Sequence, residues 1–354
     1  MYKFQISIIV IFVKNVYSQG IIGNPCTLES SNSPGVCKLL TQCKEIRDQV
    51  VFSQKLPQPC GFEGTHAIVC CPKTRRPGYM SESKCREYTS HTKEKQLCGH
   101  NIVKRIVGGK RAGRTEFPHM AILGFPMEDS DNYMWLRGGS LISEQYILTA
   151  AFGLLHIYIG RPQVVLLGVT YLNDTDHRQE IKIEKYISHP EYNNTSYYHD
   201  IGLIKLEKPI EMSSYVRPAC LNTYFNIPVA KVVITGWGQT EWGGDSSEDL
   251  LKVTLDITEY EVCNKSYQSI RMLKRGIINS MHICTQGNEL EDTCQGVTGG
   301  PVQIYHNNDK SSCMYDIVGV ISFGKACGGA PSVNIRVSHY IKWIEDIVWP
   351  ENNQ

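Results

Sequence analysis

Fourteen cysteines, six of them crowded into a short amino-terminal stretch, constrain this 354-residue chain more than any other feature of its sequence. The stretch runs from Cys26 to Cys71 and is too short to bury a large hydrophobic core, so covalent cross-links must stabilise it. Cys70 and Cys71 are adjacent and cannot readily bond to each other, so each is expected to pair with an earlier cysteine. A zinc site is the alternative, and it is disfavoured because the stretch contains no CxxC pair.

The amino terminus has the features of a secretory signal peptide, which we predict over residues 1–18. Lys3 supplies positive charge, residues 6–13 form a short apolar run, and Val16 and Ser18 suit the small-residue positions of a cleavage site. The run is too short to cross a bilayer, and a buried strand is the alternative interpretation. Secretion fits the many cysteines, which pair in oxidising compartments. Four N-x-S/T glycosylation acceptors fit the same route: Asn173, Asn193, Asn194 and Asn264.

The hydrophobic pattern changes along the chain and predicts its organisation. Residues 73–105 are rich in Lys, Arg, Ser, Thr and Glu, with a proline near their start, and are predicted to be a linker. From residue 106 onward, short apolar runs such as 164–167, 232–235 and 317–322 are bounded by Gly, Asn, Asp and Pro, which is typical of an all-β barrel or sandwich. Apolar residues at helical spacing over 341–348 predict a carboxy-terminal helix.

Five short motifs occur in order in the larger part of the chain. They are Ile106-Val107-Gly108-Gly109 after Arg105, Leu148-Thr149-Ala150-Ala151, residues 199–204 (HDIGLI), residues 235–238 (TGWG) and residues 294–301 (CQGVTGGP). Their order and spacing resemble the chymotrypsin-like serine proteases over residues 106–354, which implies two six-stranded β-barrels with the site between them. The cysteine spacing over residues 25–72 resembles the arthropod clip domain. Together these features resemble the clip-domain serine proteases and protease homologues of arthropods.

The resemblance also locates a catalytic triad that is degenerate. The position of the catalytic histidine is Phe152, the aspartate position is Asp200, and the nucleophile position is Thr298. A phenyl ring cannot accept a proton, and a hydroxyl without a base is a weak nucleophile. His156 lies four residues further on, which is too far for it to replace the base. Asp200, deprived of its imidazole, is predicted to accept hydrogen bonds from Ser322 and from nearby backbone N–H groups.

Other site positions follow from the same resemblance. Arg105–Ile106 is an activation-type cleavage site, but the residue that would pair with the freed ammonium group is Val297. Gly296 stands at an oxyanion-hole position. The positions that line the substrate pocket are Asp292, Ser322, Gly324 and Ser332. Asp292 suits an arginine or lysine substrate, whereas Ser332 replaces a glycine and is expected to narrow the pocket.

The resemblance further implies a disulfide pattern. The implied bridges are Cys26–Cys70, Cys37–Cys60, Cys43–Cys71, Cys98–Cys220, Cys263–Cys284 and Cys294–Cys327, which leaves Cys85–Cys313 by elimination. Two bridges of the family lack both cysteines here, at Arg137 and Gly153 and at Val232 and Ile304.

These observations predict a secreted, catalytically inactive protease homologue that binds proteins. It is expected to act as a cofactor or adaptor in an arthropod extracellular protease cascade (prophenoloxidase activation or innate immune signalling) or as a venom component, with clip-domain proteases or their substrates as partners. The alternatives are an active trypsin-like endopeptidase with an unusual site, and a decoy for protease inhibitors or microbial ligands. The net charge of +1 gives no reason to expect nucleic-acid binding. No motif indicates a cofactor, a metal site or a membrane span.

Overall fold

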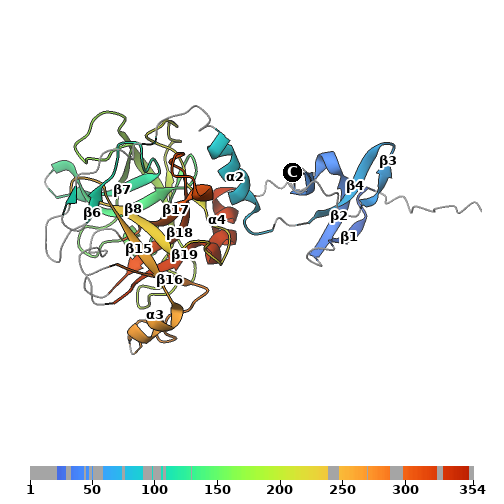
Figure 1. Ribbon diagram of the computed structural model, residues 1–354. Coiled ribbons are helices and arrows are strands. Elements are labelled where there is room, and N and C mark those ends of the chain that lie inside the picture. The colour runs from blue at the N-terminus through green and yellow to red at the C-terminus, as the bar shows by residue number, and fades with distance from the viewer. Residues whose placement is uncertain are drawn as a thin grey trace, which may run out of the picture. The chain divides into compact units, whose positions relative to one another are not determined.

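The structure is a computed structural model, and it contains two compact units that are described separately. Its described residues are 22–28, 33–43, 45–47, 50, 59–73, 76–90, 98, 105–106, 109–128, 130–237, 247–268, 270–287, 298–324 and 330–350. The units are Met1–Tyr79 and Met80–Gln354 (Figure 1). The predicted signal peptide lies outside the described residues. Within them, no helix combines the length and the apolar composition needed to cross a bilayer.

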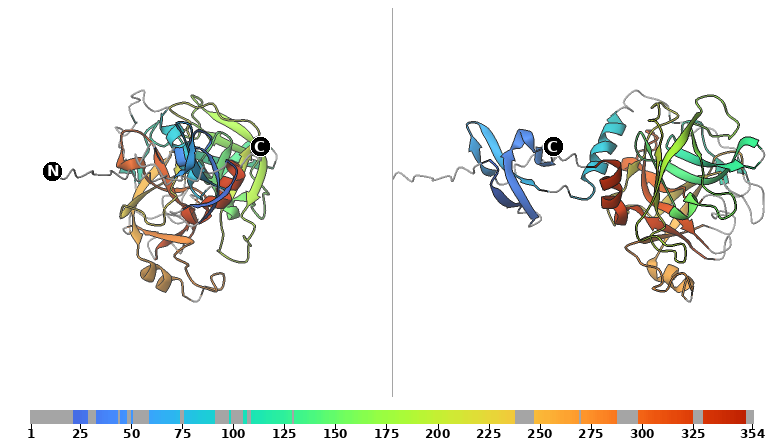
Figure 2. Two further views of the ribbon diagram at one scale, coloured as in Figure 1. Left: turned by 90° about the vertical axis from the view of Figure 1, so that its right-hand side faces the viewer. Right: turned by 180° about the vertical axis from the view of Figure 1, so that it is seen from behind.

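The first unit is a small antiparallel sheet (Figure 2), and three disulfides cross-link it. Its strands, in the order β1-β2-β4-β3, are β1 (Pro25–Leu28), β2 (Ser33–Leu39), β3 (Pro59–Glu63) and β4 (His66–Pro72). A short 3-10 turn, η1 (Leu40–Gln42), follows β2. The bridges are Cys26–Cys70, Cys37–Cys60 and Cys43–Cys71, the pairing that the clip-domain resemblance implies. Successive side chains of a strand point to opposite faces, so Cys70 and Cys71 reach different partners.

The second unit begins with a closed six-stranded barrel. Its strands are β7 (Met120–Met127), β8 (Ser130–Leu141), β9 (Tyr146–Thr149), β10 (Val164–Leu167), β11 (Gln179–Ser188) and β12 (Gly202–Leu206). They close in the order β10-β11-β12-β9-β8-β7. Leu123, Ile147 and Val165 are fully buried in its interior. The predicted strand at 164–167 is β10.

A second barrel follows in the same unit. It comprises β14 (Lys231–Gly236), β15 (Leu251–Thr258), β16 (His282–Gln286), β17 (Pro301–Tyr305), β18 (Tyr315–Phe323) and β19 (Ser332–Arg336). The order is β14-β17-β18-β19-β16-β15, and pairing of β14 with β15 closes the ring. The short strands β5 (Arg105–Ile106) and β6 (Gly109–Arg111) extend it from β15, and β13 (Cys220–Leu221) pairs with β18. The predicted double barrel is therefore confirmed.

Two helices belong to the end of this unit. Helix α3 (Tyr260–Ser266) precedes β16, and the turn η5 (Val337–Tyr340) leads into helix α4 (Ile341–Val348). Two further 3-10 turns are η3 (Ala151–Leu154) and η4 (His306–Asn308). Ile341, Ile344 and Val348 bury one face of α4 in the main core, so the predicted carboxy-terminal helix is confirmed.

The segment predicted as a linker contains a helix, α2 (Tyr79–Ser90), whose residues from Met80 onward belong to the second unit. Figures 1 and 2 show α2 beside α4. The Glu345 carboxylate of α4 accepts the backbone N–H of Ser81 at 2.7 Å, which satisfies a donor in the first turn of α2. Tyr88 is fully buried, and its hydroxyl donates to Glu144 at 3.3 Å. The sequence of α2 contains few apolar residues, so the hydrophobic pattern did not predict this helix.

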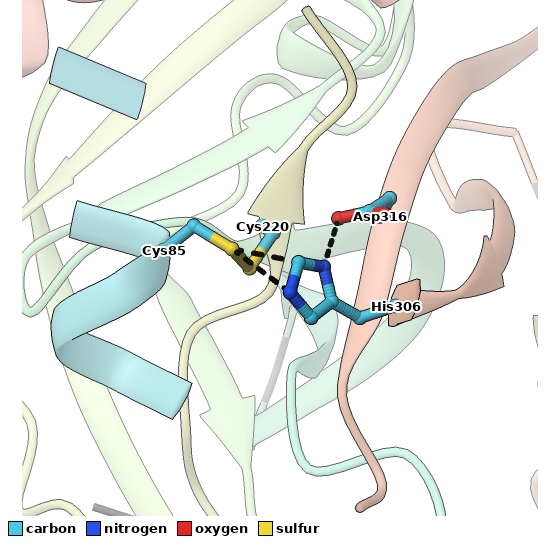
Figure 3. A group of neighbouring side chains, drawn as sticks. All are labelled: Cys85, Cys220, His306 and Asp316. Carbon is cyan, nitrogen blue, oxygen red and sulfur yellow. Dashed lines mark hydrogen bonds and ion pairs between the residues drawn. A yellow bond between two sulfur atoms is a disulfide. The ribbon is translucent and has the colours of Figure 1, made fainter. Parts of the chain in front are cut away.

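Docking of α2 corrects two implied disulfides, and Figure 3 shows one of the observed bridges, Cys85–Cys220. The structure joins Cys85 to Cys220 and Cys98 to Cys313, so the pairs Cys98–Cys220 and Cys85–Cys313 are wrong. The reason is that α2 places Cys85 against β13, where Cys220 lies, together with buried Tyr88. Another disulfide joins α3 to β16 as implied, Cys263–Cys284. The implied pair Cys294–Cys327 lies outside the described residues.

Candidate functional site

The segment that contains Thr298 is held between the two barrels. The Thr298 carbonyl accepts the N–H of Gly138 on β8 at 3.0 Å, and the next residue, Gly299, donates its N–H to the Ile321 carbonyl on β18 at 2.8 Å. Gly299 has a φ of +86°, and a Cβ there would collide with the Thr149 hydroxyl. Only glycine allows the backbone at 299 to come this close to Thr149, and this close packing fixes the position of the preceding residue, Thr298.

Asp200 lies at the same junction and is almost completely buried, with 3% of its surface exposed. One carboxylate oxygen accepts the backbone N–H of Phe152 at 2.7 Å, and the other accepts the Ser322 hydroxyl at 2.5 Å. The N–H of Ala151 contributes a further hydrogen bond. These are the donors predicted from the sequence, and they connect η3 of the first barrel to β18 of the second.

Burial raises the pKa of Asp200 above its ordinary value, although the hydrogen bonds from Ser322, Phe152 and Ala151 act in the opposite direction. The buried carboxylate has no cation among these partners, so its charged form is costly in the folded protein. A carboxyl group with a raised folded-state pKa favours folding when it is protonated. That contribution is present at low pH and is lost as the pH rises through the folded-state pKa.

Asp200→Asn is therefore expected to increase the free energy of unfolding at pH 7.5, by about 1 kcal/mol, the scale of ordinary single substitutions. Asparagine removes the charge while its oxygen still accepts from Phe152 and its amide donates to the Ser322 oxygen. Urea unfolding at pH 7.5 and pH 4 measures the effect, which should shrink at the lower pH. The matched control is Asp346→Asn on exposed α4 surface, expected to change little. The direction of the pKa shift is contradicted if Asp200→Asn stabilises the protein less at pH 7.5 than at pH 4, each measured against the natural chain at the same pH.

The position expected from the sequence to hold the general base carries an exposed phenyl ring. Phe152 is 54% exposed, and the Arg137 guanidinium lies 5.8 Å from the centre of its ring. His156 packs its ring edge-on against Phe125, and its Nδ1 faces the N–H of Tyr158 at 3.3 Å. Among the described residues, no hydrogen bond connects a histidine with the Thr298 hydroxyl. A hydroxyl nucleophile needs a proton acceptor within hydrogen-bond reach, and the phenyl ring of Phe152 cannot serve as one.

Two of the residues expected to line a substrate pocket, Gly324 and Ser332, lie close together. A Cβ added to Gly324 would lie 3.4 Å from the hydroxyl oxygen of Ser332, so the side chain of Ser332 faces Gly324 at van der Waals distance. Glycine at position 332 would leave this space open. Asp292, Gly296 and Val297 lie outside the described residues.

Two bridges implied by the family resemblance lack their cysteines here, and in each case the two residues at those positions lie close together. A Cβ added to Gly153 would lie 3.9 Å from the Cβ of Arg137, within the separation of about 3.5–4.5 Å found in disulfides. Val233 of β14 pairs with Gln303 of β17 in an antiparallel register, so the adjoining residues Val232 and Ile304 are next to each other on neighbouring strands. Both pack in one apolar cluster. The Arg137 side chain therefore packs beside Gly153 in place of one bridge, and apolar contact within one cluster takes the place of the other.

The predicted glycosylation acceptors differ in their exposure. The glycosylation acceptors Asn173, Asn193 and Asn194 are exposed, whereas Asn264 is half-buried and accepts the N–H of Ile277 at 3.0 Å. The backbone of Arg105–Ile106 forms strand β5 in a hairpin with β6.

A surface that the sequence analysis missed follows directly after Phe152. The hairpin of residues 155–160 is closed by reciprocal backbone bonds between His156 and Gly160, at 2.7 and 3.0 Å. It exposes Leu155 (54%), Ile157 (81%) and Tyr158 (83%). The signal in the sequence was the run FGLLHIYIG, whose bulky residues do not alternate with polar ones as they would in a half-buried strand. We call Phe152, Leu155, Ile157 and Tyr158 the apolar hairpin surface; such clusters mark interaction sites more often than isolated apolar residues do.

Comparisons with known proteins agree with this fold. A family model described as Trypsin matches residues 106–344. "Serine protease snk" of Drosophila melanogaster is 34% identical over 365 residues, which cover 96% of this chain and 82% of the relative. "CLIP domain-containing serine protease B4" of Anopheles gambiae is 30% identical over 359 residues, covering 93% of each chain. "Phenoloxidase-activating factor 3" of Holotrichia diomphalia is 29% identical over 356 residues, covering 92% of this chain and 96% of the relative.

Proposed function

The chain belongs to the trypsin family of serine proteases, and we propose that it is a secreted member of that family which binds proteins without cutting them. The observation that carries the proposal is the residue at position 152. The Asp200 carboxylate is buried and hydrogen-bonded to the backbone of Phe152, but the side chain there is an exposed phenyl ring. The carboxylate that would orient a histidine is kept, and the histidine is absent.

The chemical loss is large. Removal of triad members leaves only about 10³- to 10⁴-fold acceleration over water, from binding and the oxyanion hole. Thr298 also has a β-methyl group, which restricts its side-chain rotation. Loss of the acidic partner at Val297 removes the ion pair that the family uses to shape the oxyanion hole after cleavage. Each change acts on a different part of the mechanism, so they reinforce one another.

Without catalysis, the protein would act through the surfaces with which it binds other proteins. The apolar hairpin surface lies directly beside the degenerate centre in the chain, and its exposed tyrosine and isoleucine are suited to the core of a protein interface. We place the protein in an arthropod extracellular protease cascade, in prophenoloxidase activation or innate immune signalling, as a cofactor or adaptor. A relative named "Phenoloxidase-activating factor 3" supports this setting. Clip-domain proteases or their substrates are the proposed partners.

One experiment with two readouts tests this function. The purified protein, intact or cut after Arg105 by a trypsin-like enzyme, is assayed with arginine peptide substrates and a serine-directed phosphonate probe. Both forms are then used for affinity capture from haemolymph. We expect no turnover and no labelling above background, together with capture of a cascade protease or its substrate.

The controls separate the alternatives. Active trypsin carried through the same cleavage and purification controls for the assay, and Thr298→Ala controls for contamination by the cleaving enzyme. Robust turnover that Thr298→Ala abolishes overturns the proposal in favour of an unusual endopeptidase. Capture of protease inhibitors or microbial ligands alone, without a cascade protease or substrate, supports the decoy function instead.

A further inference from the structure

The loop between β11 and β12 gathers three side chains with metal-binding chemistry. His189 and Glu191 lie at its start and His199 near its end, and one ligand atom from each lies within 4.8 Å of the others. The Glu191 carboxylate is 3.7 Å from Nε2 of His199, and the two imidazole rings are stacked with centres 5.0 Å apart. We propose that His189, Glu191 and His199 bind one zinc ion.

The packing around the rings supports this assignment because it orients His199. The Tyr340 hydroxyl of η5 lies 3.3 Å from Nδ1 of His199, whereas the other ring nitrogen, Nε2, faces Glu191. When Nδ1 carries the proton and donates to the Tyr340 oxygen, Nε2 presents its lone pair toward Glu191. Metal-bound histidines commonly use the second ring nitrogen in this way.

The rest of the loop is built to hold these residues close together. His199 has a left-handed backbone with φ of 57°, which is uncommon for a residue other than glycine. The ring of His189 packs against Tyr340 and Trp343, with ring centres 5.1 Å away in each case.

The donor set selects the class of metal. Two imidazole nitrogens and one carboxylate oxygen suit zinc, with bonds of about 2.0–2.2 Å, and water can complete a tetrahedron. Calcium and magnesium prefer oxygen ligands throughout. The ligand atoms must move closer together to bind the ion. The Glu191 side chain is 70% exposed and can make most of that movement, while His199 is held by its packing at 15% exposure.

A zinc ion here would brace the loop next to the degenerate centre, because His199 directly precedes Asp200. The same loop carries the exposed acceptors Asn193 and Asn194. None of the three ligands belongs to the triad positions, so zinc binding here is independent of catalysis.

Calorimetric titration of the whole chelator-treated protein with zinc chloride tests the site. We expect one ion per chain with a dissociation constant in the micromolar range or below, and a change in tryptophan fluorescence from Trp343. His189→Gln and His199→Gln should weaken binding at least a hundredfold, and Glu191→Gln at least tenfold. The carboxylate of Glu191 is exposed, so its variant should fold normally and keeps the test valid if a histidine variant does not.

His177→Gln is the matched control, since His177 stacks on Tyr215 in another loop and should leave zinc binding unchanged. Magnesium and calcium chloride should give no binding. The proposal is overturned if no zinc binds, or if a zinc site survives the Glu191→Gln and histidine substitutions unchanged; the two rings would then be only a packing contact for Tyr340 and Trp343.

Discussion

A chain that combines Phe152→His, Val297→Asp and Thr298→Ser is expected to hydrolyse arginine peptides after cleavage at Arg105, at least a hundredfold faster than the natural chain. A positioned general base contributes about 10²- to 10⁴-fold to such reactions. Asp200 is already placed to receive the new imidazole, because its carboxylate accepts the backbone N–H of residue 152 and the Ser322 hydroxyl. Initial rates at saturating and limiting substrate measure kcat and kcat/KM.

The single substitutions are expected to do much less, because triad members act as a unit and their effects are not additive. Phe152→His alone still leaves a threonine nucleophile, and Thr298→Ser alone still lacks a base. The same comparison is repeated with Ser332→Gly added to both the substituted chain and the otherwise natural chain, so that pocket width does not hide the result. The matched control carries Thr298→Ala in place of Thr298→Ser. A substituted chain that folds, is cut and remains as inactive as this control contradicts the assignment of the three positions.

Removing both disulfides Cys85–Cys220 and Cys98–Cys313 is expected to release the amino-terminal part of the protein completely after cleavage at Arg105, whereas removing either one releases none. Each bridge joins a cysteine before residue 105 to one after it. One covalent bond is sufficient to hold the two parts in detergent, where the contacts of α2 are lost. Non-reducing gel electrophoresis of the cut protein measures the outcome as one band or two.

Paired Cys→Ser substitutions keep the test clean, since they leave no orphan thiol. The control pair removes Cys263–Cys284, which lies wholly after the cleavage site and should have no effect on release. Release of the amino-terminal part from a chain that lacks only Cys85 and Cys220 contradicts the Cys98–Cys313 bridge. Retention when all four cysteines are replaced contradicts both bridges as the tether.

Much of the fold followed from local patterns. The strand at 164–167 and the helix at 341–348 were predicted because a strand or an amphipathic helix imposes a period on nearby residues. Helix α2 was missed because its sequence, YMSESKCREYTS, is mostly polar and charged. It is held by a disulfide and by contacts to Glu144 and Glu345, which are distant in the sequence.

The absence of a proton acceptor in the side chain at position 152 is determined by the sequence alone, because no folding of the chain can give a phenyl ring a nitrogen lone pair. The partners of Asp200 were also predictable, since a buried carboxylate must find donors and the motif named them. Only the tertiary structure decided which cysteine Cys85 bonds and that Leu155, Ile157 and Tyr158 face solvent. It also decided that His189 and His199 stack beside Glu191. These features depend on how segments far apart along the chain pack together, and residue types and local spacing do not determine that packing.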